Sequence, residues 1–244
     1  MVSLVGAGGK TTLMFELARE LASEDQRVLS TTTTRIFKPD PDLSSLIYVT
    51  EDLPAVLEKL DAPVSGGLHV TAACGELAAG NKLIGYAPQQ IDVLQKTGFF
   101  EWIIVEADGA RQRPLKAPAA HEPSVPASSG WVIGVVGLEA IGKPLDDRYV
   151  FRPQQYCLLT GVAAGAPVTS ESVVRAILSP HGILKGSPPG AKRIVFLNGA
   201  EGTVRCAAGC EIARLLMERG KGTFHRIIVG SLLPKLIVVE SVGP

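Results

Sequence analysis

The chain has 244 residues, and its 24 Lys and Arg balance its 24 Asp and Glu to a formal net charge of +0. A neutral chain lacks the basic surface of proteins that bind nucleic acid or anionic membranes, and no apolar run approaches the roughly 18 residues of a membrane span. Mean hydropathy is +0.24 and aromatic residues make up only 5%, a profile typical of parallel sheets covered on both faces. We therefore expect no nucleic-acid partner and no membrane association.

The chain opens on an apolar strand, predicted over residues 2–5, that runs directly into Gly-Ala-Gly-Gly-Lys-Thr-Thr. Glycines let the backbone turn tightly and aim successive N–H groups at one point, and the following helix adds its positive N-terminal end. The pattern predicts a phosphate-binding loop, in which Lys10 contacts the outer phosphates as a catalytic group and the Thr11 hydroxyl binds Mg²⁺. The predicted nucleotide-binding residues here are Gly6, Ala7, Gly8, Gly9, Lys10, Thr11 and Thr12.

The spacing of this loop departs from the common G-x-x-x-x-G-K-[ST] pattern, because Leu4 stands five positions before Gly9. The shorter G-x-x-G-K-T-T resembles the contracted loop of Mur-type peptide ligases as much as that of common GTPases. A glycine-rich turn with a solvated lysine is the alternative interpretation. The N-terminus has no basic region and no cleavage site, so we expect no signal peptide. A first strand this close to residue 1 suggests that a short leader has been lost.

Residues 11–22 have apolar side chains at helical spacing, and residues 27–30 are predicted to form a strand. Four threonines and an arginine follow this strand at positions 31–35. Since β-branched residues favour strands, the threonines can simply extend it. Because the carboxyl ends of parallel strands face the ligand in open sheets, Thr33, Thr34 and Arg35 are equally candidates for a second-ligand site or a switch.

The next predicted elements are a short strand at residues 47–49, a helix around residues 53–60 and a strand over residues 68–73. Residues 82–87 are predicted to form a hairpin that lies over the site. Pro88 suits the first position of the helix that follows.

A continuous apolar strand, predicted over residues 102–105, ends in Glu106-Ala107-Asp108. Side chains alternate along a strand, so Glu106 and Asp108 are expected on one face. Buried carboxylates need partners or a metal. We expect both as catalytic residues and Mg²⁺ ligands, one holding the ion and the other orienting the attacking group. Simple ion pairing with Arg111 or Lys116 is the alternative.

A long proline-rich connection follows, with cations at Arg111, Arg113 and Lys116. Long connections without secondary structure are uncommon unless they are functional or disordered. These three residues are predicted to bind an anionic second ligand or to act as a switch, and solvated surface charge is the alternative.

Further strands are predicted over residues 131–136, 193–197, 227–229 and 236–239, and helices over residues 154–160, 172–178 and 203–219. Strands that alternate with helices predict an α/β fold, a three-layer α/β/α sandwich with a mostly parallel sheet. Together with the phosphate loop, this predicts a P-loop NTPase of the GTPase-related (SIMIBI-like) group. We expect a single domain, residues 1–244, with loop insertions near residues 74–87 and 110–130.

The four cysteines include no C-x-x-C pair, which fits a reducing, cytoplasmic environment. Cys206 and Cys210 lie one helical turn apart and could share a metal or form a redox pair. They also fall on one apolar stripe with Ala213 and Met217, so we expect core packing.

Four stretches together resemble the YqeC family, described as accessory proteins of selenium-dependent molybdenum hydroxylases. They are the loop over residues 3–12, the threonine run over 31–35, the segments 105–110 and 113–118, and the strand over 132–138, supported by Gly142-Lys143-Pro144-Leu145 and Arg152-Pro153. The resemblance covers nearly the whole chain. It implies a cytoplasmic NTP-binding protein whose partner is a molybdenum hydroxylase or its maturation machinery.

The base-reading motif departs from that of GTPases, which place Asn-Lys-x-Asp after a strand to recognise guanine. This chain has Asn198-Gly199-Ala200-Glu201. Asn198 remains a predicted nucleotide-binding residue, and Glu201 could still accept hydrogen bonds from a guanine ring. ATP is at least as consistent with this motif as GTP.

Three functions are therefore open. The leading prediction is a slow, Mg²⁺-dependent NTP hydrolase, with ATP or GTP as ligand, that acts as a maturation factor and can form a homodimer. The second is a small-molecule kinase or ligase that acts on an acidic acceptor held by the cations near Arg111. The third is a non-catalytic module in which the nucleotide is a regulatory ligand.

Overall fold

A computed structural model describes residues 1–44, 46–58, 60 and 67–243 of the chain. The chain forms two compact units, which are described separately. Unit 1 comprises Met1–Leu4, Thr11–Gly109 and Ser124–Gly130, and unit 2 comprises Val5–Lys10, Ala110–Pro123 and Trp131–Pro244. The single domain expected from the sequence stays a prediction.

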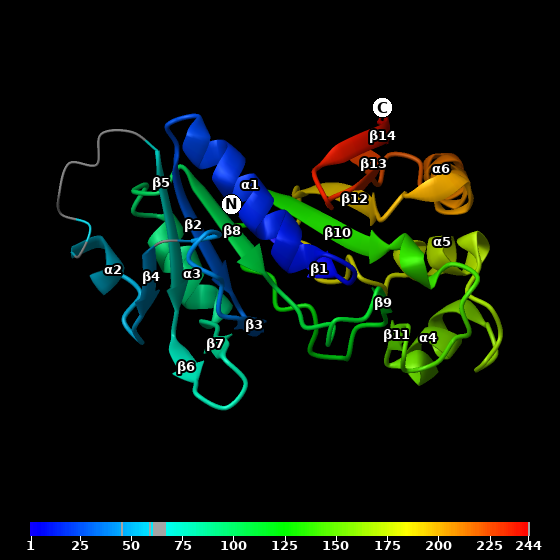
Figure 1. Ribbon diagram of the computed structural model, residues 1–244, viewed down its shortest axis with the longest axis horizontal. Helices are drawn as coiled ribbons and strands as arrows, with labels where there is room; N and C mark the ends of the chain where they lie inside the picture. Colours follow the sequence, from blue (N-terminus) through cyan, green and yellow to red (C-terminus); the bar gives the residue numbers. More distant parts are fainter. Residues whose placement is uncertain (45, 59, 61–66, 244) are drawn as a thin grey trace. The chain divides into compact units, whose positions relative to one another are not determined.

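Unit 1 is built on five parallel strands in the order β1-β8-β2-β5-β4 (Figure 1). Their bounds are β1 (Val2–Gly6), β2 (Arg27–Thr32), β4 (Leu46–Val49), β5 (Leu68–Ala73) and β8 (Trp102–Glu106). The helices are α1 (Lys10–Ser23), α2 (Ala55–Glu58) and α3 (Pro88–Gln95). The predicted helix around residues 53–60 is thus α2, and residue 59 lies outside the described residues.

Helices lie on both faces of the sheet in unit 1, as the alternation of side chains along its strands shows. Val70 of β5 packs in one buried cluster with Ile91 and Leu94 of α3. His69, the preceding residue of β5, has its ring 6.0 Å from the ring of Phe15 in α1. Because neighbouring strand residues point to opposite faces, α1 and α3 cover opposite faces of this sheet.

A small antiparallel sheet has the strand order β3-β7-β6, and β3 follows β2 directly in the chain. Its strands are β3 (Arg35–Phe37), β6 (Gly75–Leu77) and β7 (Lys82–Ile84). A hairpin is thus present in the expected region, but it is formed by β6 and β7 over residues 75–84 and not by residues 82–87. It lies against the threonine run, since Gly85 N donates to Thr34 O at 2.7 Å and Tyr86 N donates to Thr32 O at 2.9 Å.

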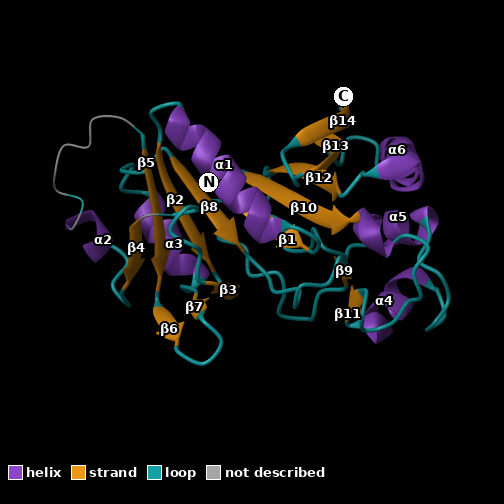
Figure 2. Cartoon of the chain, viewed as in Figure 1, coloured by secondary structure: helices purple, strands orange, loops and turns teal. Residues whose placement is uncertain are grey.

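Unit 2 contains parallel strands in the order β10-β12-β13, with β14 antiparallel to β13 (Figure 2). The bounds are β10 (Trp131–Gly137), β12 (Lys192–Asn198), β13 (Arg226–Ser231) and β14 (Ile237–Val242). The helices are α4 (Pro153–Thr160), α5 (Ser170–Leu178), α6 (Gly202–Arg219) and the 3-10 turn η1 (Leu138–Ala140). An α/β chain with mostly parallel strands, as predicted, is confirmed.

Two very short strands, β9 (Leu115–Lys116) and β11 (Val150–Phe151), pair with each other in unit 2. Both were missed at the level of sequence, because two residues carry no periodicity. Their pairing orders part of the connection that was expected to be irregular.

The apolar stripe expected on α6 is wrong for both cysteines and for Met217. The helix buries Ala208, Gly209, Ile212, Ala213 and Leu216, while Cys206, Cys210 and Met217 are half-buried. Gly209 explains the difference, because a Cβ there would lie 2.6 Å from a methyl of Val229. The helix approaches β13 most closely at this glycine, and the buried face is centred on it.

None of the helices in the described part of the chain combines the length and the hydropathy needed to cross a membrane.

Candidate functional site

The glycine-rich loop connects β1 to α1, and its backbone adopts conformations that side chains disfavour. Gly6, Gly8 and Gly9 have φ of 94°, 86° and 124°, in the left-handed region that favours glycine. A Cβ on Gly8 would lie 2.5 Å from Cα of Gly137 and 2.7 Å from the carbonyl oxygen of Pro114. The loop therefore packs backbone against backbone and has no room for a side chain at position 8.

Lys10 is the first residue of α1 and is only 4% exposed. Its Nζ donates to the carbonyl oxygen of Gly6 at 2.6 Å, so the ammonium lies over the loop's own backbone. A phosphate oxygen would offer this ammonium a stronger, charge-assisted acceptor than a neutral carbonyl.

Asn198 holds the loop from the neighbouring strands of unit 2. Its Nδ2 donates to Gly8 O at 2.7 Å, and its Oδ1 accepts from Leu232 N at 3.1 Å. Strand register explains this placement, since Asn198 pairs with Gly137 of β10, the residue against which Gly8 packs. Asn198 thus positions the loop, a role that the sequence did not indicate.

Glu201, the other residue of the altered base-reading motif, is engaged within the protein. Its Oε1 accepts from Ser231 Oγ at 2.6 Å, and its Oε2 lies 3.1 Å from Nη2 of Arg205. Both acidic oxygens therefore have partners in unit 2.

The carboxylates expected at the end of β8 are buried in unit 1, with Glu106 6% and Asp108 1% exposed. Thr11 Oγ1 donates to Glu106 Oε2 at 2.7 Å. This contact joins the first turn of α1 to the end of β8. Asp108 lies two residues beyond the last residue of that strand.

The end of β8 is fixed by the segments on both sides. Ala107 N donates to Leu4 O at 2.9 Å, and Thr33 N donates to Glu106 O at 3.1 Å. The Thr32 hydroxyl also donates to Glu106 O, at 2.7 Å. Thr31 and Thr32 thus extend β2, as one interpretation of the run predicted, and the end of the run also holds the backbone of the carboxylate segment in place.

The donor set at Thr11 and Glu106 fits a magnesium ion. Mg²⁺ takes oxygen ligands at 2.0–2.1 Å in an octahedron, so neighbouring ligands lie about 2.9 Å apart. The hydroxyl and carboxylate oxygens are 2.7 Å apart, close to that spacing. Among the described residues no cluster of three or more His, Cys, Asp or Glu could hold a metal, so an ion here would need further oxygens from water or a bound phosphate.

The other residues predicted to bind a second ligand in unit 1 differ from one another in their contacts and exposure. The Thr33 hydroxyl donates to Ser124 O at 2.8 Å. Thr34 lies beside Gly109, whose Cβ, if present, would be 3.7 Å from Oγ1 of Thr34. Arg35 is exposed on β3.

The three cations of the connection in unit 2 also differ from one another. Lys116 has a fully buried side chain, and its Nζ lies 2.8 Å from Oε2 of Glu122. Arg113 donates to the carbonyl oxygen of Asp147. Arg111 stacks over the ring of Phe151, with 5.3 Å between its Cζ and the ring centre.

Arg152 was not predicted to be part of this region. Its Nη1 and Nη2 donate to the two carboxylate oxygens of Glu122 at 2.7 and 2.9 Å. Burial alone would raise the pKa of Glu122, but the hydrogen bonds from Arg152 and Lys116 outweigh it and lower the pKa to about 2. Glu122 is therefore a carboxylate at neutral pH.

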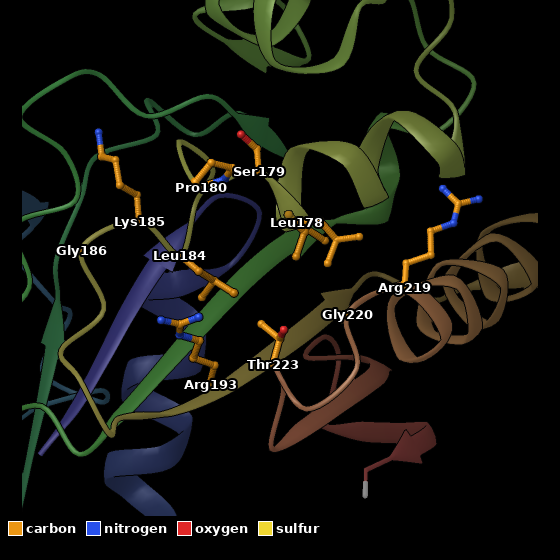
Figure 3. Close-up of a pocket in the computed structure, with 11 residues that line it drawn as sticks. Leu178, Ser179, Pro180, Leu184, Lys185, Gly186, Arg193, Arg219, Gly220 and Thr223 are labelled. Atoms are coloured by element: carbon orange, nitrogen blue, oxygen red, sulfur yellow. The ribbon is translucent and has the colours of Figure 1, made fainter.

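A separate cavity of about 440 Å³ in unit 2 contains none of the predicted site residues (Figure 3). It lies where α5 and α6 end, and Lys185 and Arg219 at its rim turn their charged ends away from it. Those ends bind Ala119 O at 2.8 Å and Glu171 at 2.7 Å. Helix C-termini carry partial negative charge, whereas Arg193 of β12 also lines the cavity, and we assign the cavity no ligand.

The fold and site together define an α/β protein with parallel strands, a glycine-rich loop before its first helix and a hydroxyl–carboxylate pair directly after that loop. The family described as YqeC protein matches residues 2–154. The chain is 36% identical over 200 residues to a relative from Escherichia coli (strain K12) named "Uncharacterized protein YqeC", which covers 81% of this chain and 75% of the relative. The chain belongs to the YqeC family, as the sequence motifs indicated. No solved structure matches it.

Proposed function

We propose that the chain binds a magnesium nucleoside triphosphate at the glycine-rich loop and hydrolyses it slowly, as a GTPase-related P-loop NTPase. The observation that carries this proposal is the Thr11–Glu106 hydrogen bond of 2.7 Å. Thr11 follows Lys10 in the chain, so the peptide bond joins the predicted metal ligands to the phosphate-binding loop. Loop, hydroxyl and carboxylate are the three parts that phosphoryl transfer requires.

Each residue has a distinct part in the proposed chemistry. The loop N–H groups and Lys10 bind the phosphates and stabilise charge that develops on the transferred group. Thr11 and Glu106 hold Mg²⁺, which neutralises phosphate charge when bound. Asp108, buried next to this segment, orients the attacking water.

The proposal leaves the base as either adenine or guanine. Asn198 and Glu201 have their polar atoms occupied by Gly8, Leu232, Ser231 and Arg205. Their engagement supports recognition through the phosphates more than through the base.

Calorimetric titration with ATP, GTP, ADP and GDP, each with Mg²⁺, tests nucleotide binding. Lys10→Ala is expected to abolish binding, and Lys10→Met, which keeps the apolar stem, is expected to do the same. Lys96→Ala, at an exposed position of unit 1, is the matched control and should bind as the parent does. Unchanged affinity in both Lys10 variants would overturn the proposal.

Metal dependence provides a second test. Thr11→Val keeps the shape of the side chain and removes the hydroxyl, and Glu106→Gln removes the carboxylate charge. Both should lower the affinity for the magnesium nucleotide while leaving the weaker affinity measured in EDTA unchanged. A loss that is equal with and without Mg²⁺ would show that these residues do not act through the metal.

For the cellular role, we propose that nucleotide turnover assists the maturation of a selenium-dependent molybdenum hydroxylase, as the family resemblance implies. The test compares hydroxylase activity in cells that carry the parent chain, the Lys10→Met variant or no copy. Equal hydroxylase activity in all three would contradict this role, whereas loss in the variant cells as well as in the cells with no copy would show that nucleotide binding, and not mere presence of the protein, is required.

A further inference from the structure

Backbone strain in the described residues is concentrated around one aromatic ring of unit 2. Five non-glycine residues have φ between 47° and 64°, namely Asp25, Asn81, Arg111, Gln112 and Arg152. Asp and Asn tolerate this left-handed region, but Arg and Gln do not. Arg152 follows Phe151 directly, and Arg111 stacks on its ring. Such conformations persist where the surroundings over-determine them, and they cluster at functional sites.

Positive charge is concentrated at the same ring. The charged groups of Arg152, Arg111 and Lys116 lie 4.2, 5.3 and 5.8 Å from the centre of the Phe151 ring. One carboxylate, Glu122, serves two of them, through Lys116 at 2.8 Å and Arg152 at 2.7 Å. The half-buried Glu122 thus pairs with two of these cations, and Arg111 is the third.

Arg111 is the cation of this cluster that is available to a ligand. In the part of the chain that the structure describes, its guanidinium contacts the Phe151 ring but makes no hydrogen bond or ion pair. The side chain is exposed, and Arg113 N donates to Ala110 O at 3.0 Å, which closes the tight turn that presents it. A guanidinium held on an aromatic face keeps its planar fork free for two parallel bonds to an oxyanion.

The backbone around this cluster is held by hydrogen bonds and extends to a contact with the phosphate-binding loop. Ala117 N donates to Phe151 O at 3.1 Å, and Leu115 N donates to Tyr149 O at 3.2 Å. Pro114, the second residue after the turn, accepts from Gly137 N at 2.8 Å and packs under Gly8. Arg111, in the strained turn, therefore lies three residues before Pro114, which contacts the loop.

We propose that Arg111, with Arg152 and Phe151, forms a binding site for a small oxyanion, either an inorganic oxyanion or the phosphate or carboxylate of a metabolite. The site is separate from Gly6–Lys10 and needs no nucleotide. Lys116 is not a ligand of this anion, because its buried ammonium is held by Glu122. If the proposed nucleotide site also holds, this is where an acidic second substrate binds.

The test is calorimetric titration of the full chain with inorganic phosphate, sulfate and succinate at constant ionic strength. The Lys10→Met background removes phosphate binding by the loop, so the result does not depend on the proposed function. We expect saturable binding that weakens about tenfold or more in Arg111→Gln, as loss of a bidentate charged contact predicts. Arg111→Gly should weaken it equally, and because glycine relieves the left-handed strain this variant should fold at least as well.

Arg148→Gln is the matched control. Arg148 is also exposed, and its Cζ lies 5.8 Å from the centre of an aromatic ring, that of Tyr149, but its guanidinium is paired with Asp146 at 2.7 Å. This variant should bind phosphate within about twofold of the parent. The proposal is overturned if the Lys10→Met chain binds none of the three anions, if the Arg111 variants bind as well as their parent, or if Arg148→Gln loses as much. Preference among the three anions shows whether the site recognises phosphate, sulfate or carboxylate.

Discussion

Replacing Asn198 by alanine removes the hydrogen bond that ties the glycine-rich loop to the end of β12 and the one that ties Asn198 to Leu232, directly after β13. The lost contacts are the bond of 2.7 Å to Gly8 O and the bond of 3.1 Å from Leu232 N. Leu232 is only 2% exposed, so water cannot readily replace the second one. A buried donor left without its acceptor costs about 1–3 kcal/mol, and an ordinary hydrogen bond contributes about 1 kcal/mol. The expected loss in the free energy of unfolding is therefore about 2–4 kcal/mol.

Asn198→Asp separates the two contacts. A carboxylate can still accept from Leu232 N, but it cannot donate to Gly8 O. This variant should lose about half as much stability as Asn198→Ala, and its negative charge should also weaken phosphate binding at the loop. Together the two variants distinguish an anchoring role from a direct contact with ligand.

Urea unfolding measures the loss in the free energy of unfolding, and hydrogen exchange locates it in the chain. Exchange should accelerate in peptides that cover residues 5–12 and 230–234, with little change over residues 153–178 on the other side of unit 2. The reasoning is refuted if Asn198→Ala costs less than about 0.5 kcal/mol, the range of an ordinary surface substitution, and leaves exchange of the loop unchanged.

Three further changes have defined outcomes. Gly8→Ala puts a Cβ 2.5 Å from Gly137 Cα and should abolish nucleotide binding in calorimetry, while Gly142→Ala, with φ of +74° but open space around it, should cost only about 1–2 kcal/mol of unfolding free energy. Burial lowers the pKa of His69 to about 4, below its unfolded value, so the stability it contributes is lost as pH falls from about 6.5. By pH 4.5 the loss is about 2.5 kcal/mol, and His69→Gln should remove that part of the pH dependence in urea unfolding; an unchanged profile would contradict the assignment. The pKa of Glu122, about 2 in the folded chain, gives a contribution that is present above pH 4.5 and lost toward pH 2. The parent should lose about 2 kcal/mol between pH 7 and pH 3 from this group, whereas Glu122→Gln should be less stable at pH 7 and flatter below pH 5.

Sequence periodicity predicted most of the long elements, because each strand or helix of five or more residues leaves a pattern of its own. The helix ends also have local causes, since the Thr169 side chain accepts from Ser172 N at the start of α5 and Gly220 follows the last residue of α6. The face that α6 buries did not. It depends on which residue of β13 meets the helix, and the close approach at Gly209 shifted the buried face away from Cys206 and Cys210.

The same difference between local patterns and long-range contacts explains which parts of the candidate site could be predicted. Gly6 to Thr11 is a local motif, so its glycines could be predicted from adjacent residues, as could the carboxylates at the end of β8. The pairing of Thr11 with Glu106, 95 positions apart, required only that two strands be parallel neighbours. Asn198 was assigned to the base because its motif resembled one that reads guanine, yet strand register carries it to the loop backbone instead.

The Phe151 cluster lay beyond the reach of sequence reasoning for a further reason. Two of its members, Lys116 and Phe151, lie in β9 and β11. Each of these strands has only two residues, so no periodicity in the sequence predicts that Leu115 pairs with Val150 and Lys116 with Phe151. The sequence could present Arg111 and Lys116 only as similar cations of one connection. The two cations differ in burial. Lys116 is buried and pairs with Glu122, whereas the left-handed turn keeps Arg111 exposed on the Phe151 ring. What distinguishes the structural cation from the binding one here is thus a carboxylate partner, and removing Glu122 by Glu122→Gln should release the Arg152 guanidinium for the anion and raise phosphate affinity in the Lys10→Met chain.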